Sequence, residues 1–234
     1  MNTARYLNTV ENCLNIQLTP DIYTEGNVLV CGLSGQGKSA LLKNMAIQLC
    51  NKGTSITFVS NVPVFDKSDT SNINKNVVDV AGFVKIAEDL KKEMMNRFNM
   101  MDQQHVNHVF KLNIPVQPKV LIVDGFDFYM HSADYKSVDA IKQCLSSIAR
   151  LGRPAAIMLV ISCQRPSGNV ISTDLYNNIV NRINVGKITD ASESMLIFNT
   201  NVNINVPFGI GIYQNAIKSD ADFSIFKIED VKNF

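Results

Sequence analysis

One segment of eight residues, Gly32 to Ser39, constrains this chain more than any other feature of its sequence. It reads GLSGQGKS and matches the pattern G-x-x-x-x-G-K-[ST] at every fixed position. The apolar run VLVC at 28–31 precedes it, and residues 39–49 carry leucine, methionine and alanine at helical spacing. A strand, a glycine-rich loop and a helix in this order form the context in which the pattern binds phosphates. The alternative, a glycine-rich turn that binds nothing, does not explain this context.

The segment predicts a binding site for a nucleoside triphosphate and Mg²⁺. Glycines let the backbone wrap tightly, so that successive N–H groups point at phosphate oxygens, and the following helix adds its positive N-terminal end. Lys38 is expected to reach the β- and γ-phosphates, and the Ser39 hydroxyl to coordinate Mg²⁺. The expected binding residues are Gly32, Leu33, Ser34, Gly35, Gln36, Gly37, Lys38, Ser39 and Ala40.

A second part of the site is expected at Asp124, which follows the apolar run VLIV at 120–123. Such runs are typical of strands buried on both faces of a parallel sheet. Aspartate is costly to bury without a partner, and ligands of open α/β sheets bind at the carboxyl ends of the strands. We therefore predict that Asp124 holds Mg²⁺ through water. The alternative is that Asp124 only caps the next turn.

The rest of the chain alternates short apolar runs with longer amphipathic stretches, which predicts an α/β fold with a mainly parallel sheet covered on both faces. Residues 61–76 are polar and predict a long surface loop. Gly152 is expected to end a helix in the left-handed conformation, before Pro154. Strands are expected at 28–31, 55–59, 120–123, 156–162, 182–185, 209–213 and 223–228, and helices at 39–49, 81–101, 137–151 and near 175–180.

Composition and charge exclude several other classes of protein. With 46% hydrophobic residues the chain is not disordered, and a net charge of +1 excludes a strongly basic coat for nucleic acid. Any DNA contact must come from local clusters or from subunits arranged in a ring. Five widely spaced cysteines indicate buried thiols in a reducing compartment, and no apolar run reaches the roughly 18 residues of a membrane span. We expect a cytoplasmic protein without direct membrane insertion.

Several segments together resemble the motor domain of the FtsK/SpoIIIE DNA translocases, which belong to the HerA/FtsK group of RecA-like P-loop ATPases. The resemblance spans most of residues 26–215. An E-M-x-x-R-[FY] stretch combined with A-R-L-G-R and Q-R-P-S is more specific than the phosphate loop alone. The matching segments are CGLSGQGKSALLKNMAIQL, LKKEMMNRFNMMDQQHVNHVFKLN, KVLIVDGFDFYM and SIARLGRPAAIMLVISCQRPSGNVISTDLYNNIVNRINVGK, with a weaker match at VPFGIGIYQNA.

The resemblance implies a RecA-like three-layer α/β/α sandwich, with residues 26–234 as one domain after a short lead, 1–25. Lys38 and Ser39 would be the Walker A pair and Asp124 the Walker B aspartate. Gln164 would be the polar sensor after a core strand. The remaining candidates are Arg150 and Arg153, either of which would reach a neighbouring subunit's nucleotide as an arginine finger. The alternative for both arginines is a plain surface role near a helix C-terminus.

The chain departs from the family at one important position. Members usually carry Glu directly after the Walker B aspartate, where it orients the hydrolytic water, and this chain has Gly125. Loss of that carboxylate would slow hydrolysis. Asp127 lies past the strand end on the same edge and is the candidate replacement. His105 and His108 have H-x-x-H spacing, but the sequence shows no third ligand at a recognisable spacing, so a solvated helix end is favoured over a metal site.

The function that the resemblance implies is an ATP-driven DNA translocase, working as a ring, expected to be a hexamer, around double-stranded DNA without reading its sequence. Residues 165–173 and 61–76 are the candidate DNA-facing elements. We expect a coupling ATPase of conjugative transfer, with a relaxase or another mobile-element protein as partner. Two alternatives stay open: a genome-packaging ATPase of a virus or phage, and a weakly or non-hydrolysing adaptor that recruits a relaxase or replication protein.

Overall fold

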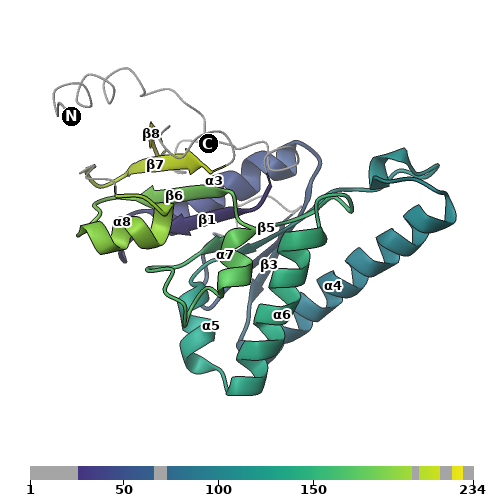
Figure 1. The fold of residues 1–234 in the computed structure, drawn as a ribbon, viewed down its shortest axis with the longest axis horizontal. Coiled ribbons are helices and arrows are strands. Elements are labelled where there is room, and N and C mark those ends of the chain that lie inside the picture. The colour runs from purple at the N-terminus through teal and green to yellow at the C-terminus, as the bar shows by residue number, and fades with distance from the viewer. Residues whose placement is uncertain (1–25, 66–72, 202–205, 217–222, 229–234) are drawn as a thin grey trace.

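One mixed sheet of eight strands organises the computed structural model, which describes residues 26–65, 73–201, 206–216 and 223–228 (Figure 1). The strand order is β3-β2-β4-β5-β1-β6-β7-β8. The pairs from β3 to β6 are parallel, whereas β7 pairs antiparallel with β6 and β8 antiparallel with β7. The strands are β1 Val28–Cys31, β2 Ser55–Ser60, β3 Ile73–Val77, β4 Lys119–Val123, β5 Ile157–Ser162, β6 Asn181–Val185, β7 Ile210–Asn215 and β8 Phe223–Lys227.

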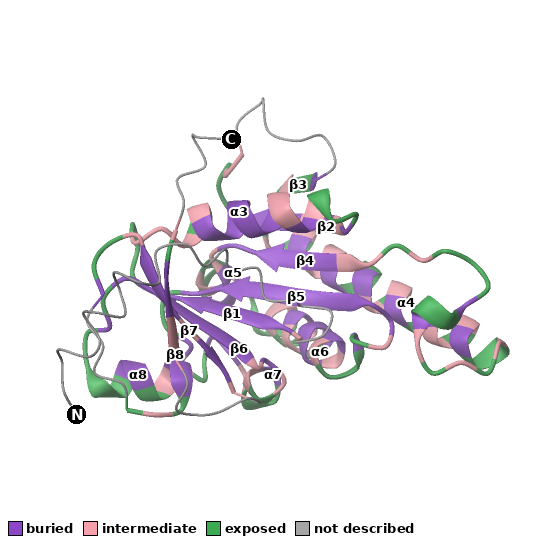
Figure 2. Ribbon diagram, turned by 90° about the horizontal axis from the view of Figure 1, so that it is seen from above, coloured by how far each residue is buried: buried purple, intermediate pink, exposed green. Residues whose placement is uncertain are grey.

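Helices cover both faces of the sheet, so the predicted three-layer α/β/α fold is confirmed (Figure 2). The core beneath α3 contains Val28 and Val30, while Leu29 and Cys31 face the opposite core. This alternation follows from the period of two along a strand. The helices are α3 Lys38–Asn51, α4 Val80–Gln103, η1 Val109–Lys111, α5 Phe126–Ser132, α6 Tyr135–Leu151, α7 Thr173–Asn177 and α8 Ala191–Phe198.

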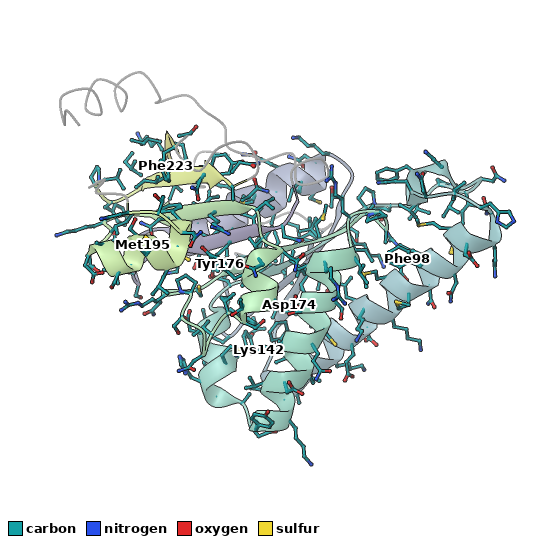
Figure 3. The ribbon with its side chains drawn as sticks, viewed as in Figure 1. Phe98, Lys142, Asp174, Tyr176, Met195 and Phe223 are labelled. Atoms are coloured by element: carbon teal, nitrogen blue, oxygen red, sulfur yellow. The ribbon has the colours of Figure 1, made fainter. Side chains whose placement is uncertain are left out.

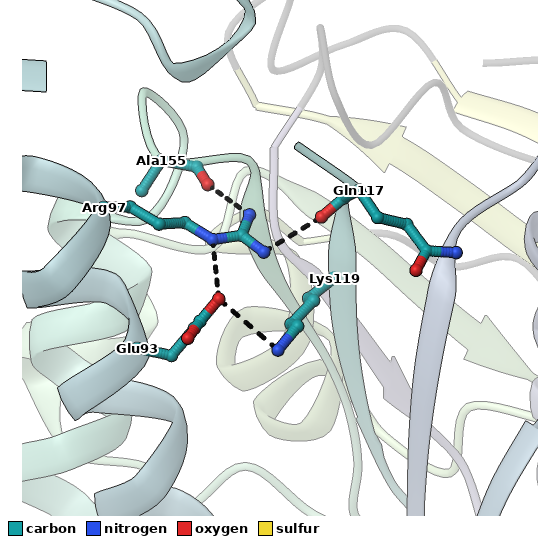
Figure 4. A network of polar contacts seen from close by, with 5 residues as sticks. All are labelled: Glu93, Arg97, Gln117, Lys119 and Ala155. Carbon is teal, nitrogen blue, oxygen red and sulfur yellow. Dashed lines mark hydrogen bonds and ion pairs between the residues drawn. The ribbon is translucent and has the colours of Figure 1, made fainter. Parts of the chain in front are cut away.

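A buried arginine anchors the long helix α4 to the rest of the domain (Figure 4). Arg97 is 4% exposed and donates hydrogen bonds to the carbonyl oxygens of Ala155, at 2.8 Å, and Gln117, at 2.9 Å. Its Nε donates to Glu93 at 3.0 Å, and Lys119 forms an ion pair with the same carboxylate at 3.4 Å. Glu93 and Arg97 are the fixed residues of the E-M-x-x-R stretch, which therefore joins α4 to the segments before β4 and β5.

Tyr176, a residue of α7, holds α7 to α8 through its side chain (Figure 3). Its hydroxyl donates a hydrogen bond to the carbonyl oxygen of Ile197 in α8, at 3.3 Å. The guanidinium of Arg182, in β6, lies 4.1 Å from the centre of the tyrosine ring. Such cation–π contacts contribute about 0.5–2 kcal/mol, more when desolvated.

Two local predictions from the sequence are wrong. Gly152 has φ −67°, the right-handed conformation; glycine is needed there because a Cβ atom would lie 2.1 Å from the carbonyl oxygen of Ile157. The left-handed residue of this turn is Ala156, with φ 51°. The predicted loop at 61–76 contains β3, a largely exposed edge strand whose polar residues hid it from a hydrophobic pattern. Residues 66–72 of that loop lie outside the described part of the chain.

Other predicted elements agree with the structure to within a few residues, and Phe223–Lys227 does form the predicted edge strand. The helices α5 and α8 were not predicted. No helix in the described parts of the chain is both long and apolar enough to cross a bilayer. The predicted N-terminal lead, residues 1–25, is outside the described residues.

Candidate functional site

The phosphate loop links β1 to α3 and is shaped by three glycines with positive φ. The φ angles are 138° at Gly32, 76° at Gly35 and 108° at Gly37, values that residues with a side chain rarely adopt. At Gly32 space is a second constraint, because a Cβ atom would lie 2.3 Å from the carbonyl oxygen of Val185 in β6. The fixed glycines of the motif are therefore required by backbone geometry.

Lys38 folds back over the loop that precedes it. Its Nζ donates hydrogen bonds to the carbonyl oxygens of Gly32, at 2.7 Å, and Leu33, at 3.0 Å. Burial lowers the pKa of Lys38, against the opposing effect of the nearby Asp124 and Asp127 carboxylates. The ammonium group is thus held beside the loop, where the motif requires it to meet phosphate oxygens.

A cleft of about 520 Å³ opens beside the loop, at the carboxyl ends of β2, β4 and β5. The strand order explains its composition: β5 lies between β1, which leads into the loop, and β4, which leads into Asp124. The cleft thus brings together predicted residues from three segments far apart in the sequence. Its lining residues are Ser34, Gly35, Gly37, Lys38, Ser39, Ala40, Asn61, Val62, Asp124, Gly125, Asp127, Phe128 and Gln164.

Asp124 is 6% exposed, and its carboxylate does not cap the next turn. Its Oδ1 accepts a hydrogen bond from the Ser162 hydroxyl, in β5, at 2.7 Å. The Ser162 oxygen in turn accepts from the backbone N–H of Gly125 at 2.9 Å. Gly125 begins α5 without a capping side chain. The capping alternative for Asp124 is therefore wrong.

Asp127 and Gln164 are also in the cleft, and they are joined to each other. The Asp127 carboxylate accepts a hydrogen bond from the backbone N–H of Gln164 at 2.8 Å. The Gln164 carbonyl oxygen accepts from the N–H of Gly32 at 3.4 Å. This chain of contacts fixes α5, the end of β5 and the start of the phosphate loop relative to one another.

The residues present fit a magnesium ion. Ser39 and Asp124 line the same cleft, and hydroxyl and carboxylate oxygens are the donors that Mg²⁺ prefers. Asp124 is buried, and the only hydrogen bond to its side chain among the described residues comes from the uncharged Ser162. Lys38 lies near Asp124, but the two form no ion pair among the described residues, and a buried carboxylate without such a pair favours a bound cation.

Arg150 and Arg153 lie far from this cleft. Arg150 is in the last turn of α6, and Arg153 follows before β5 begins at Ile157, so both exposed side chains are at the amino end of β5. The six residues of β5 span about 20 Å at roughly 3.3 Å per residue. Within one chain neither arginine reaches the phosphate loop.

His105 and His108 do not form a metal site. His105 lies beyond the end of α4, with φ 53°, and the Nδ1 of His108 accepts a hydrogen bond from the N–H of Phe110. Across the described ranges no cluster of three or more His, Cys, Asp and Glu side chains is able to hold a metal. His108 thus caps η1, and His105 lies just beyond the end of α4.

Four residues of the site were not predicted: Asn61, Val62, Phe128 and Ser162. Ser162 and Asn61 each stand where a polar residue closes or follows an apolar strand, the same signal that identified Asp124. That signal was therefore present in the sequence. Val62 and Phe128 carry no such signal, because an apolar side chain in a loop does not indicate a site.

Comparison with known proteins identifies relatives by sequence and by fold. No protein-family model matches the chain. The type VII secretion system protein EssC of Staphylococcus aureus (strain NCTC 8325 / PS 47) is 26% identical over 197 residues, and the match covers 74% of this chain and 12% of that protein. This chain therefore spans about an eighth of the curated relatives it matches.

Two solved structures have the same fold. The pCW3 conjugation coupling protein TcpA, solved with ATPγS, superposes with a TM-score of 0.79 at 20% identity, covering 93% of this chain and 65% of that one. The genome packaging NTPase B204 of Sulfolobus turreted icosahedral virus 2, solved with AMPPCP, superposes with a TM-score of 0.54 at 16% identity, covering 88% of this chain and 98% of that one. With its phosphate loop, this chain has the fold of an FtsK/SpoIIIE-type P-loop ATPase motor domain.

Proposed function

We propose that this chain is a motor ATPase that binds Mg·ATP in the cleft and hydrolyses it. One observation carries the proposal: the fold places Lys38, Ser39 and Asp124 around a single cleft at the carboxyl ends of the strands. Neither a structural glycine turn nor a solitary buried aspartate accounts for that arrangement. The curated match to EssC and the fold shared with TcpA support the same class of protein.

Each group of residues in the cleft would have its own role in binding Mg·ATP. Backbone N–H groups of the loop bind the phosphates, and Lys38 exchanges its two carbonyl contacts for β- and γ-phosphate oxygens. Ser39 and Asp124 hold Mg²⁺, which neutralises charge on the phosphates when bound. Ser162 keeps the Asp124 carboxylate oriented. Gln164, whose backbone is tied to Asp127, senses the γ-phosphate at the end of β5.

We further propose that ATP hydrolysis drives movement of double-stranded DNA through a ring of subunits in the cytoplasm, as in conjugative coupling. The likeness to the conjugation coupling protein TcpA supports this proposal. Because Arg150 and Arg153 are exposed and distant from their own loop, either would act only on a neighbouring subunit's nucleotide. A relaxase or another mobile-element protein would be the partner, and residues 165–173 would face DNA.

Two specific observations favour second candidates. The match to EssC favours a motor of a secretion system, and the fold shared with B204 favours genome packaging. A non-hydrolysing adaptor is the remaining alternative, because Gly125 stands where the family usually has a carboxylate. All of these candidates use the same nucleotide cleft and differ in whether ATP turns over and in what stimulates its turnover.

The test is ATP binding and turnover by the full chain. Calorimetry should detect Mg·ATPγS binding, and the Lys38→Ala variant should lose most of it. Steady-state ATPase activity should rise on addition of double-stranded DNA. Absence of nucleotide binding by the wild-type chain contradicts the proposal as a whole. Binding without turnover, with or without DNA, favours the adaptor, and turnover that DNA leaves unchanged contradicts the DNA motor.

A further inference from the structure

Asn61 occupies the side of the cleft where the family's usual carboxylate is missing. It directly follows Ser60, the last residue of β2, and lines the cleft with Asp124 and Gly125. Its Oδ1 faces Gly125 closely: a Cβ atom built on that glycine would lie 3.4 Å from it. The amide therefore lies beside the position that a side chain at residue 125 would use to enter the cleft.

The backbone at Gly125 disfavours a glutamate at this position. Gly125 has φ 74° and ψ 48°, the left-handed conformation, and its N–H donates to the Ser162 hydroxyl. A glutamate at this position would be strained, because residues with a Cβ atom rarely adopt this conformation. The Cβ atom of a side chain at this position would also lie in van der Waals contact with the Oδ1 of Asn61.

Asn61 is the polar residue nearest to the position that a side chain at residue 125 would occupy. Its Oδ1 is the one atom of the described residues, the chain neighbours of Gly125 left out, within 4 Å of a Cβ built on that glycine. The Asp127 carboxylate accepts a hydrogen bond from the N–H of Gln164, and Lys38 is assigned above to the phosphates. Asn61 is exposed at the cleft, and no hydrogen bond of its side chain occurs among the described residues. A primary amide both accepts and donates, so one group can hold a water through its oxygen and a phosphate oxygen through its nitrogen.

We propose that Asn61 is a catalytic residue that orients the attacking water for hydrolysis of the γ-phosphate; this inference rests on the ATPase function proposed above. The Asn61 Oδ1 accepts a hydrogen bond from the water, and the amide nitrogen donates to a γ-phosphate oxygen. A neutral amide takes no proton, so its role is positional, like that of the glutamine that orients water in some GTPases.

The reaction balances without a protein base. The water oxygen bonds to the γ-phosphorus while the bond from that phosphorus to the β,γ-bridging oxygen breaks, and ADP leaves with the bridging oxygen. One proton of the water stays on the released phosphate, and the other passes to bulk water. Asn61 thus supplies orientation where other members of the fold use a carboxylate.

The test compares Asn61→Ala with Asn96→Ala, a matched control at an exposed position of α4 remote from the cleft. We expect Asn61→Ala to lower kcat about 100-fold, in line with the loss of one oriented hydrogen-bonding group in a catalytic site. Its affinity for Mg·ATPγS should stay within about threefold of wild type. Its affinity for ADP·aluminium fluoride, which mimics the transition state, should fall about as much as kcat. Asn61→Gln, which keeps the amide, should recover part of both losses.

Other outcomes separate the two proposals. If the wild-type chain binds and hydrolyses ATP, but Asn61→Ala matches Asn96→Ala in kcat and in binding of ADP·aluminium fluoride, the role of Asn61 is refuted and the ATPase function stands. The role is refuted equally if Asp127→Asn removes turnover while Asn61→Ala retains it. If the wild-type chain binds no Mg·ATPγS, the proposed function itself fails.

Discussion

The Ser162 hydroxyl donates a hydrogen bond of 2.7 Å to the Asp124 carboxylate, joining the carboxyl ends of β5 and β4 beneath the nucleotide cleft. The same oxygen accepts the N–H of Gly125 at 2.9 Å. One fully buried hydroxyl therefore satisfies an acidic side chain and the backbone turn that follows it. Through this relationship β5 supports the proposed metal ligand Asp124, although its own apolar residues only pack in the core.

Replacement of Ser162 by alanine should weaken both folding and metal-dependent binding. The change leaves a buried carboxylate and a backbone N–H without a partner, and each unsatisfied buried group costs about 1–3 kcal/mol. We expect denaturant unfolding to show a loss of about 2 kcal/mol, and Mg²⁺-dependent affinity for ATPγS to fall. Ser147→Ala, on the exposed side of α6, is the control and should change neither property. A Ser162→Ala chain with wild-type stability would contradict this role.

The charge of Lys38 should make nucleotide binding sensitive to alkaline pH. Burial lowers its pKa below the ordinary value of 10.5, so between the lowered pKa and 10.5 the folded free chain binds fewer protons than the unfolded chain. In that window the contribution of Lys38 to the free energy of unfolding therefore rises with pH. Phosphate binding requires the charged lysine, so affinity for ATPγS should fall with pH there, and binding should take up protons.

Calorimetry in two buffers of different ionisation enthalpy measures this proton uptake. Lys38→Ala should remove the part that arises from Lys38. Lys142→Ala is a suitable control, because burial also lowers the pKa of Lys142, but this residue lies on α6 outside the cleft. An affinity that is independent of pH in this window would show that Lys38 does not bind the phosphates.

Arg97 should matter for stability and not for chemistry. Alanine at this position leaves the carbonyl oxygens of Ala155 and Gln117 without their buried donor, at about 1–3 kcal/mol each, so we expect a loss of about 2–5 kcal/mol. Arg97→Lys should recover little, because an ammonium lacks the planar fork that reaches both carbonyls. Urea denaturation measures the loss, and nucleotide affinity per folded molecule should be unchanged. A variant that folds normally but loses turnover would assign the residue to catalysis.

Replacement by alanine should abolish nucleotide binding at Gly32 and be tolerated at Gly168. At Gly32 the methyl group would meet the Val185 carbonyl oxygen at 2.3 Å in a backbone with φ 138°, so Gly32→Ala should distort the loop and abolish ATPγS binding. At Gly168 a methyl group would meet no atom within 4 Å, and its φ is outside the left-handed range. Gly168→Ala should leave ATPγS binding unchanged and should change the free energy of unfolding by no more than about 1 kcal/mol. Equal binding by both variants contradicts the geometry described for the loop.

Much of the fold and most of the residues that line the cleft could be predicted from the sequence, because their signals are local. The phosphate loop, α3, β4 and Asp124 each follow from a few consecutive residues. The partners of Asp124 could not be predicted in this way, since Ser162 is 38 residues away and becomes its neighbour only through the pairing of β4 with β5. Asn61 likewise meets Gly125 only because β2 lies beside β4.

The errors have a similar cause. Gly152 was assigned a left-handed conformation because glycine commonly ends helices in this way, whereas the structure requires glycine for the close approach of the Ile157 carbonyl. The edge strand β3 has the sequence INKNV, and only Ile73 is buried, so its hydrophobic signal is a single residue. In both cases a tertiary neighbour decides the local structure.

The contacts of the phosphate loop bear on how tightly a ligand can be held. Gln36 lies against Gly186, Gly32 against Val185, and Lys38 bonds back to the loop carbonyls, so contacts within the protein hold the loop in shape. Association then requires little loss of conformational entropy in the loop, and preorganisation of this kind strengthens affinity without adding contacts. A small domain can in this way hold a highly charged, strongly hydrated ligand.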